Sequence, residues 1–190
     1  MDERRFNIKK KALLDSPERR KLLPPEKLLS LLSIKSNDSI LDLGAGTGYF
    51  TIPASIMTQG DVYALDLEKE LLDVIQSQIE EQNISNIHLI QGKAQAIPLA
   101  SSSIDIVIAS LILHAVEPLS KGICEIYRVM KQGAYLLCFE WEKKESPMGP
   151  PIHIRIPSEE MEALFLEKSF KIIKKVFPTD FLYIYIIQKM

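Results

Sequence analysis

The chain has 190 residues, of which 46% are hydrophobic and 25% are charged, a composition that excludes disorder, collagen-like repeats and a disulfide scaffold. Its formal net charge of -2 and its sequence pI near 6.0 argue against an obligate nucleic-acid binder. The longest apolar stretch, residues 104–116, is shorter than the ~20 residues needed to cross a bilayer, and no apolar block follows the charged N-terminus. We therefore expect a cytoplasmic protein without a membrane partner.

Charge is unevenly distributed along the chain. Residues 1–35 carry ten Lys and Arg but only five Asp and Glu. Such a segment either forms a solvated face or attracts an anionic substrate. The two cysteines, Cys124 and Cys138, lack metal-ligand spacing, so we expect no metal site and interpret both as small buried residues.

Strand and helix patterns alternate along the chain, and no repeat or linker divides residues 1–190 into more than one domain. Apolar residues recur every three or four positions in 69–82, as in an amphipathic helix, whereas 104–110 is almost continuously apolar, as in a strand covered on both faces. In chain order, we predict a helix over 24–33, a strand over 39–43, a helix over 47–57, a strand over 61–65, a helix over 69–82, strands over 87–91 and 104–110, a helix over 119–130, a strand over 135–140, a helix over 158–169 with Ser158 as N-cap, and strands over 171–177 and 182–188. The short connection between the last two strands predicts an antiparallel hairpin, and the whole pattern predicts an α/β sheet with helices on both faces.

The most informative segment is ILDLGAGTG at residues 40–48, an apolar strand followed by three alternate glycines and a helix. Glycine permits a sharp turn and the close approach of a ligand, and the start of a helix presents free amide groups. Asp66 ends the next strand, where a carboxylate can accept both hydroxyls of a ribose. We expect these two strand ends to hold one nucleoside.

The glycine spacing argues against other nucleotide sites. A dinucleotide fingerprint requires glycine where this chain has Tyr49, and no phosphate loop of the GxxxxGK[ST] type is present. Asp42 precedes the glycines and is placed to hold an amino group, directly or through water, which favours an amino-acid tail over a pyrophosphate. A nicotinamide oxidoreductase is the weaker alternative.

At these residues the chain resembles the class I S-adenosylmethionine-dependent methyltransferases, especially the type 11, quinone-biosynthesis C-methyltransferase-like branch. The resemblance covers roughly residues 15–190. It rests on ILDLGAGTG at 40–48, VYALDLEKELLD at 62–73, AQAIPLASSSIDIVIASLILH at 94–114 and EIYRVMKQGAYLL at 125–137. It implies a Rossmann-like three-layer sandwich whose seven-stranded sheet has the order 3-2-1-4-5-7-6, with strand 7 antiparallel.

The resemblance also implies S-adenosylmethionine as cofactor and S-adenosylhomocysteine as product. Carried over by position, the glycines pass along the methionine moiety, Asp66 binds the ribose and Leu67 lies against the adenine. Lys93 replaces an Asp that accepts the adenine amino group in many members, so this contact falls to the backbone of Ala94, to Gln95, or is lost. The residues expected to bind the cofactor are Asp42, Gly44, Ala45, Gly46, Gly48, Asp66, Leu67, Ala94 and Ser110.

Methyl transfer from a sulfonium requires mainly in-line alignment and exclusion of water. When the acceptor is a hydroxyl or an acidic carbon, a proton must also leave, and the candidate catalytic residues for this are His114 and then Glu140. The alternatives are that His114 shapes the pocket or caps a helix, and that Glu140 is a solvent-side carboxylate.

Residues 110–113 read SLIL rather than the Asn/Asp-Pro-Pro-Tyr of amide and nucleobase N-methyltransferases, so the resemblance favours a small-molecule acceptor methylated at carbon or oxygen. We expect residues 1–33 to form an N-terminal helical cap, and 142–157 to form either a substrate-side lid or a rigid connection closed by Arg155. The alternative function is a non-catalytic nucleoside-binding or assembly module, motivated by Lys93. The sequence is compatible with a monomer and with an oligomer.

Overall fold

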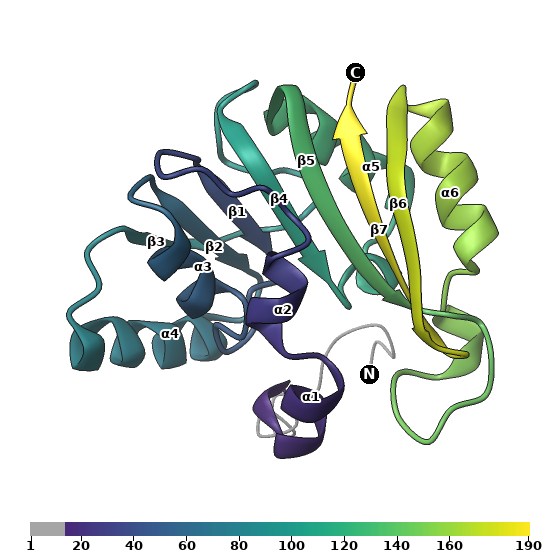
Figure 1. The fold of residues 1–190 in the computed structure, drawn as a ribbon, viewed down its shortest axis with the longest axis horizontal. Coiled ribbons are helices and arrows are strands. Elements are labelled where there is room, and N and C mark those ends of the chain that lie inside the picture. The colour runs from purple at the N-terminus through teal and green to yellow at the C-terminus, as the bar shows by residue number, and fades with distance from the viewer. Residues whose placement is uncertain (1–13) are drawn as a thin grey trace.

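The computed structural model describes residues 14–190, which form one seven-stranded sheet with helices on both sides (Figure 1). The strands are β1 (Ile40–Leu43), β2 (Val62–Asp66), β3 (Ile87–Gln91), β4 (Ile104–Ser110), β5 (Met130–Trp141), β6 (Phe170–Thr179) and β7 (Leu182–Lys189). The helices are α1 (Pro17–Leu22), α2 (Pro25–Leu29), α3 (Thr51–Met57), α4 (Lys69–Gln82), α5 (Leu119–Val129) and α6 (Ser158–Glu167), with short 3₁₀ turns η2 (Leu113–Ala115) and η3 (Ile152–Ile154). None of these helices is long and apolar enough to span a membrane.

The strands are arranged in the order β3-β2-β1-β4-β5-β7-β6, and β7 runs antiparallel to both of its neighbours. The other pairings are parallel. The predicted fold class, strand order and antiparallel hairpin are therefore confirmed. Strand order reverses between β1 and β4, and ligands of open α/β sheets bind outside the carboxyl ends of the strands at such a point.

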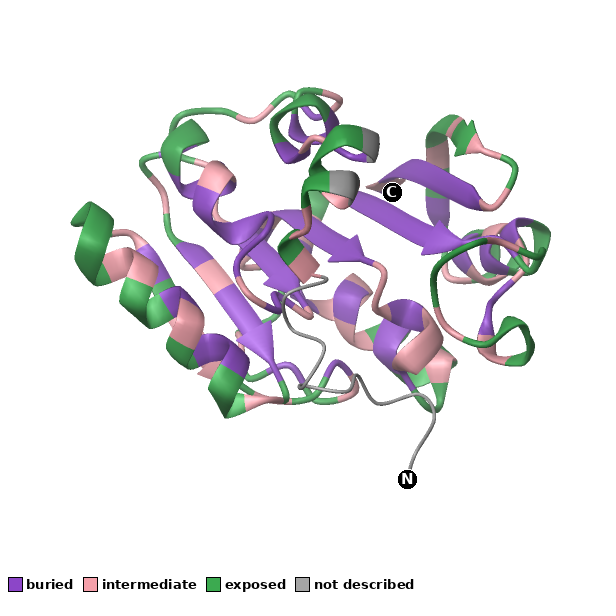
Figure 2. Cartoon of the chain, turned by 90° about the horizontal axis from the view of Figure 1, so that it is seen from below, coloured by how far each residue is buried: buried purple, intermediate pink, exposed green. Residues whose placement is uncertain are grey.

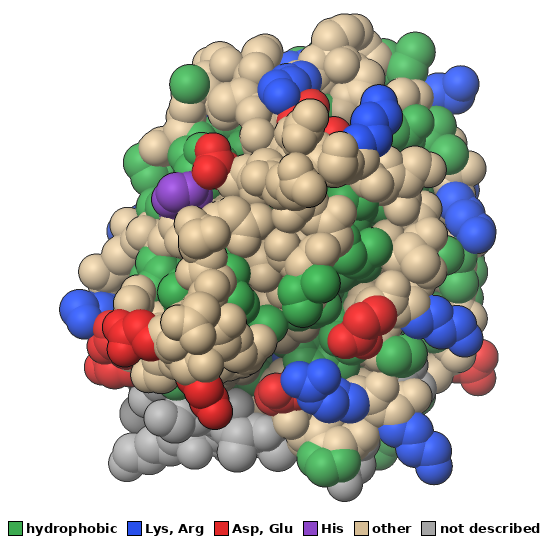
Figure 3. Space-filling view, turned by 60° about the vertical axis from the view of Figure 1, so that its left-hand side comes forward, with side chains coloured by type: hydrophobic (Ala, Val, Ile, Leu, Met, Phe, Trp, Pro, Cys, Tyr) green, Lys and Arg blue, Asp and Glu red, His purple; other side chains and the backbone are tan. Residues whose placement is uncertain are grey.

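The core has two apolar layers, because successive side chains of a strand point to opposite faces of the sheet. In β4, Val107 and Ala109 pack in the layer that contains α5 and α6, whereas Ile106 and Ile108 pack in the layer that contains α2, α3 and α4. Figure 2 shows the central strands buried between these helices, as predicted from the continuous apolar sequence of β4. On the face shown in Figure 3, acidic and basic side chains lie interspersed among hydrophobic ones.

Two elements begin four or five residues away from their predicted starts. Helix α3 begins at Thr51 rather than at residue 47, because the preceding residues form the turn, with positive φ at Gly44, Gly46 and Gly48. Strand β5 begins at Met130 rather than at residue 135, directly after α5. The sequence pattern placed the glycine turn correctly but underestimated its length.

Two predictions about single residues are wrong. Pro157 is the N-cap of α6, and Ser158 lies inside the helix, where its N–H points to the carboxylate of Glu142 at 3.2 Å. Cys138 is buried as predicted, but Cys124 is exposed. Cys124 lies on the solvent-facing side of α5, although its neighbour Ile123 is buried.

Of the predicted N-terminal cap, residues 1–13 lie outside the described residues. Helix α2 ends at Leu29 rather than near residue 33, and Leu28, Leu29 and Leu32 are buried in the α3 side of the core. Helix α1 lies below the sheet in Figure 1, on the side where the parallel strands end. The described part of the cap is therefore close to the carboxyl edge of the sheet.

The loop over residues 142–157 is held together by Arg155, which is 6% exposed. Its guanidinium donates to three carbonyl oxygens of the same loop, those of Lys144 (2.7 Å), Pro150 (2.9 Å) and Met148 (3.1 Å). Of the two interpretations of this loop, these contacts support the rigid connection. A lid function stays a prediction.

Candidate active site

The glycine turn, residues 44–48, is fastened to the end of β2. The N–H groups of Gly44 and Ala45 both donate to the carbonyl oxygen of Leu65, at 2.8 and 3.0 Å. Gly44 has φ +73° and Gly46 has φ +57°, a region that glycine adopts without strain. The chain can therefore turn sharply at the end of β1 and lie against the end of β2.

The glycines also make room for the chain's own side chains. A Cβ atom at Gly44 would lie 2.5 Å from Cγ1 of Ile112, and one at Gly46 would lie 3.3 Å from Cδ1 of Leu14. The expectation that the missing Cβ atoms admit a ligand is therefore corrected for these two positions. A ligand that follows the turn must lie beside Ile112 and Leu14.

Asp66 ends β2 and faces the glycine turn. Its Oδ2 accepts a hydrogen bond from the N–H of Gly46 at 2.8 Å, and its Oδ1 accepts one from the N–H of Glu68 at 2.9 Å. The side chain is 8% exposed, and burial raises its pKa. Because each carboxylate oxygen can accept a further hydrogen bond, the fixed carboxylate can still receive a pair of hydroxyls.

Asp42 lies in β1, two residues before the turn, and is almost completely buried. Burial raises the pKa of its carboxyl to about 6, against the lowering effect of a 2.6 Å hydrogen bond from Oγ1 of Thr51. The negative charge of Asp66 raises this pKa further, while the positive charge of Arg19 lowers it. Two buried carboxyl groups so close together favour a cationic group nearby.

Three buried side-chain atoms of the described residues have no hydrogen-bond partner: Nε of Arg19, Oγ1 of Thr47 and Oγ of Ser110. Thr47 belongs to the glycine turn, and Ser110 ends β4 beside it, since Ala109 pairs with Leu43. Buried polar atoms without a partner are rare and require an explanation, such as a bound ligand. A nucleoside with an amino-acid tail brings donors and acceptors to this edge, so the residues fit the cofactor that the sequence resemblance implies.

The residues expected near an adenine differ in their exposure and in the hydrogen bonds that they already make. Leu67 is 41% exposed and offers an apolar surface next to the end of β2, while Ala94 is buried. The side chain of Lys93 is exposed, and the amide of Gln95 donates to the carbonyl oxygen of Glu117 at 2.8 Å. The Oε1 atom of Gln95 and the backbone carbonyl of Ala94 are both able to accept from an adenine amino group, so the two alternatives stay open.

His114 and Glu140 form a pair where β4 and β5 end. Nδ1 of His114 lies 2.9 Å from Oε2 of Glu140, and Glu140 also accepts from the N–H groups of Leu113 (2.7 Å) and Trp141 (3.1 Å). Because a carboxylate only accepts, Nδ1 carries the hydrogen, and Nε2 is the ring nitrogen able to take up a proton. Glu140 is completely buried, so its interpretation as a solvent-side carboxylate is wrong.

No sequence pattern specifically indicated Arg19, Thr47 or Thr51 as part of the site. The excess of basic residues over 1–35 was a general signal, but it did not distinguish Arg19 from its basic neighbours. Thr47 and Thr51 lie in or just after the glycine motif, and a hydroxyl at these positions is the signal that points to a partner of the cofactor or of Asp42.

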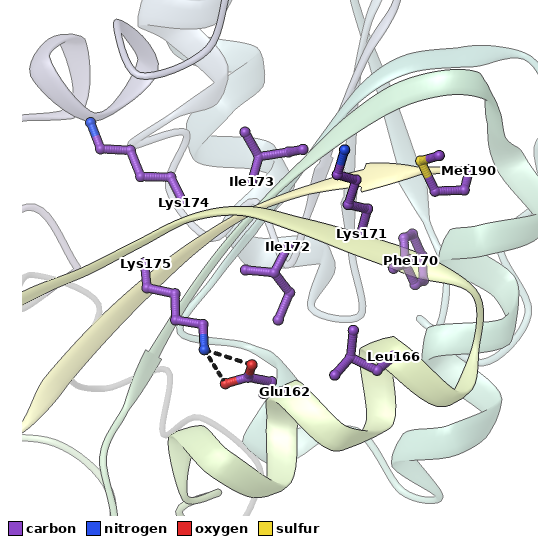
Figure 4. A pocket seen from close by; sticks show the side chains of 9 residues that line it. All are labelled: Glu162, Leu166, Phe170, Lys171, Ile172, Ile173, Lys174, Lys175 and Met190. Carbon is purple, nitrogen blue, oxygen red and sulfur yellow. Dashed lines mark hydrogen bonds and ion pairs between the residues drawn. The ribbon is translucent and has the colours of Figure 1, made fainter.

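The hollow shown in Figure 4 lies elsewhere, between α6 and the edge strand β6, and measures about 520 Å³. Nζ of Lys175 contacts the two carboxylate oxygens of Glu162 in it, at 2.6 and 2.5 Å. Because β4, β5 and β7 separate β6 from β1, we do not assign this hollow to the site at the glycine turn. Within residues 14–190, no cluster of His, Cys, Asp and Glu is arranged to hold a metal ion.

Residues 41–138 match the family model of the methyltransferase domain. The demethylmenaquinone methyltransferase of Lactiplantibacillus plantarum is 29% identical over 127 residues, which cover 65% of this chain and 54% of that protein. The ubiquinone/menaquinone biosynthesis C-methyltransferase of Marinomonas sp. is 29% identical over 123 residues, covering 63% and 49%. A SAM dependent methyltransferase from Aquifex aeolicus has a crystal structure that matches with a TM-score of 0.90 and 25% identity, covering 98% of this chain and 100% of that one.

The chain belongs to the methyltransferase-domain family, because the family model matches just over half of its residues. The resemblance inferred from the sequence motifs is thereby confirmed. The chain spans about half the length of the curated relatives that it matches. Their substrates are therefore not transferred to it directly.

Proposed function

We propose that this protein transfers the methyl group of S-adenosylmethionine to a carbon or oxygen atom of a small-molecule acceptor. The observation that carries the proposal is the meeting of the glycine turn, the Asp66 carboxylate and the unpartnered hydroxyls of Thr47 and Ser110 at the carboxyl edge of the sheet. This edge is where open α/β sheets bind nucleotides. The similarity to the SAM dependent methyltransferase of Aquifex aeolicus supports the same cofactor.

The residues proposed to hold the cofactor are Asp42, Gly44, Ala45, Gly46, Gly48, Asp66, Leu67, Ala94 and Ser110. Asp66 accepts the ribose hydroxyls, and Asp42 attracts the ammonium group of the methionine moiety, directly or through water. Leu67 packs against the adenine. When bound, the cofactor supplies a methyl group on a positively charged sulfur, and it leaves as the neutral thioether S-adenosylhomocysteine.

His114 is the proposed proton acceptor. As the new bond to the methyl group forms, the acceptor loses a proton from the reacting carbon or hydroxyl, and Nε2 of His114 takes it up. Glu140 holds the ring through Nδ1 and stabilises the resulting imidazolium. The C-methyltransferase named among the relatives supports an acceptor with an acidic C–H group.

A panel of phenols, hydroquinones and other compounds with acidic C–H or O–H groups tests this function. The protein is incubated with methyl-labelled S-adenosylmethionine, and the products are identified by mass spectrometry. We expect one methylated product formed together with an equal amount of S-adenosylhomocysteine. Cofactor binding without any product across the panel would favour the non-catalytic module instead. The cytoplasmic location and an oligomeric state stay predictions from the sequence.

A further inference from the structure

Arg19 is a partly buried cation whose Nε atom is buried without a hydrogen-bond partner. It lies in α1, and its Cζ is 4.1 Å from the centroid of the Tyr49 ring. Nη1 donates to the carbonyl oxygen of Leu14 at 2.6 Å, whereas the buried Nε has no partner. Because an unsatisfied buried donor on a cation is costly, the arrangement indicates a place for an anion.

Two contacts hold this part of the chain against the glycine turn. Leu14 lies beside Gly46, with Cδ1 3.3 Å from the position that a Cβ would take there. The hydroxyl of Tyr49, the residue after Gly48, donates to the carbonyl oxygen of Leu23 at 2.7 Å. The segment from Leu14 to Leu23 therefore lies across the turn that we assign to the methionine moiety, and Arg19 lies within it.

The electrostatics of Arg19 differ from those of its neighbour. Burial lowers the pKa of Arg19, while nearby Asp42 favours its charged form; the group stays a cation, since arginine is not deprotonated in proteins. Arg20 is half exposed and already forms a two-point ion pair with Asp15, at 2.5 and 2.8 Å. Arg19 thus carries a buried donor without a partner, whereas the charge of Arg20 is exposed and already paired with Asp15.

We propose that Arg19 binds the carboxylate of the methionine moiety of S-adenosylmethionine. This inference rests on the proposed function and extends it. The Nε edge of the guanidinium provides the planar donor arrangement that matches a carboxylate. Asp42 on one side and Arg19 on the other then face the two opposite charges of the amino-acid tail, and α1 becomes part of the cofactor site.

A comparison of two ligands on two variants tests this contact. S-adenosylhomocysteine carries the amino-acid tail, whereas 5′-methylthioadenosine has the same adenosine and thioether without it. Calorimetric titration of R19Q should show binding of S-adenosylhomocysteine weakened by about 10- to 100-fold, as expected for a charge-assisted hydrogen bond. The affinity for methylthioadenosine should stay that of the wild type, and the matched variant R20Q should leave both affinities unchanged.

The outcomes separate this contact from a structural role. An equal loss of affinity for both ligands in R19Q would mean that Arg19 only supports the shape of the site, and no loss for either would mean that it does not meet the tail. R19K keeps a cation and should recover part of the lost S-adenosylhomocysteine affinity, while a loss as large as that of R19Q would count against the proposal. A wild-type protein that binds neither ligand would overturn the proposed function itself, and this inference with it.

Discussion

Oε2 of Glu140 lies 2.9 Å from Nδ1 of His114, although 26 residues separate the two in the sequence. They meet because β4 and β5 are parallel neighbours, so the residues just after β4 lie beside the end of β5. The side chain of His114 is 10% exposed and that of Glu140 is fully buried. Glu140 is therefore placed to position His114, whereas the sequence indicated only two separate candidates.

Replacing His114 with Gln removes the proposed proton acceptor. We expect kcat to fall by about 10²- to 10⁴-fold, the usual contribution of a general base. The affinity for S-adenosylhomocysteine should not change, because the ring is not among the proposed cofactor contacts. Steady-state kinetics and calorimetry measure the two effects. A variant with wild-type kcat would show that His114 only shapes the pocket.

Replacing Glu140 with Gln disturbs both the fold and the pair. The carboxylate accepts hydrogen bonds from several N–H groups, and a glutamine must turn its own NH₂ toward one of them. We expect the free energy of unfolding to fall by about 1–3 kcal/mol, together with a reduced kcat. Denaturant unfolding measures the first effect, and the exposed Glu81→Gln is the control that should change neither. Stability equal to that of the control would contradict the hydrogen-bond arrangement.

Replacing Asp42 with Asn should raise stability at neutral pH. The pKa of Asp42 is about 6 in the folded protein against an ordinary value of 3.8, so the folded state binds the proton more tightly. Wild-type stability therefore falls as the pH rises from about 4 to 6 and stays at the lower level above that window. Since Asn does not ionise, the variant should be about 1–3 kcal/mol more stable above pH 6, and this gain should disappear toward pH 4.

Denaturant unfolding of both proteins across this pH range measures the effect of Asp42. The same variant should bind S-adenosylmethionine more weakly than the wild type, because the ammonium group loses its carboxylate. Parallel pH profiles in the two proteins would show that another group is responsible.

A comparison of Gly44→Ala with Gly133→Ala separates steric conflict from backbone strain. Both glycines have positive φ, +73° and +77°. A Cβ at Gly133 meets nothing closer than 4.0 Å, whereas one at Gly44 would lie 2.5 Å from Ile112. We expect a loss of about 1–2 kcal/mol at Gly133 and a clearly larger one at Gly44. Equal losses in thermal or denaturant unfolding would contradict the contact with Ile112.

The sequence was sufficient for the architecture because its signals are local. The continuous apolar run of β4, the periodicity of α4 and the short connection before β7 each depend on residues close together in the chain. The glycine motif and Asp66 were likewise read from two neighbouring strand ends. Family resemblance then supplied the strand order, which periodicity alone does not determine.

The features that could not be predicted depend on contacts between distant segments. Ile112 fills the space beside Gly44, and Arg19 reaches the glycine turn from a short helix that precedes the sheet. The burial of Glu140 follows from the pairing of β5 with both of its neighbours. Spacing along the chain carries no information about such pairings.

Calorimetric titration of the purified protein with S-adenosylmethionine tests the central claim most directly, with Asp66→Asn as the comparison. The account predicts saturable binding with one site per chain in the wild type, weakened by about tenfold or more in the variant, whose amide cannot accept at both positions as the carboxylate does. A wild-type protein that shows no binding, by calorimetry and by equilibrium dialysis with labelled cofactor, would contradict it.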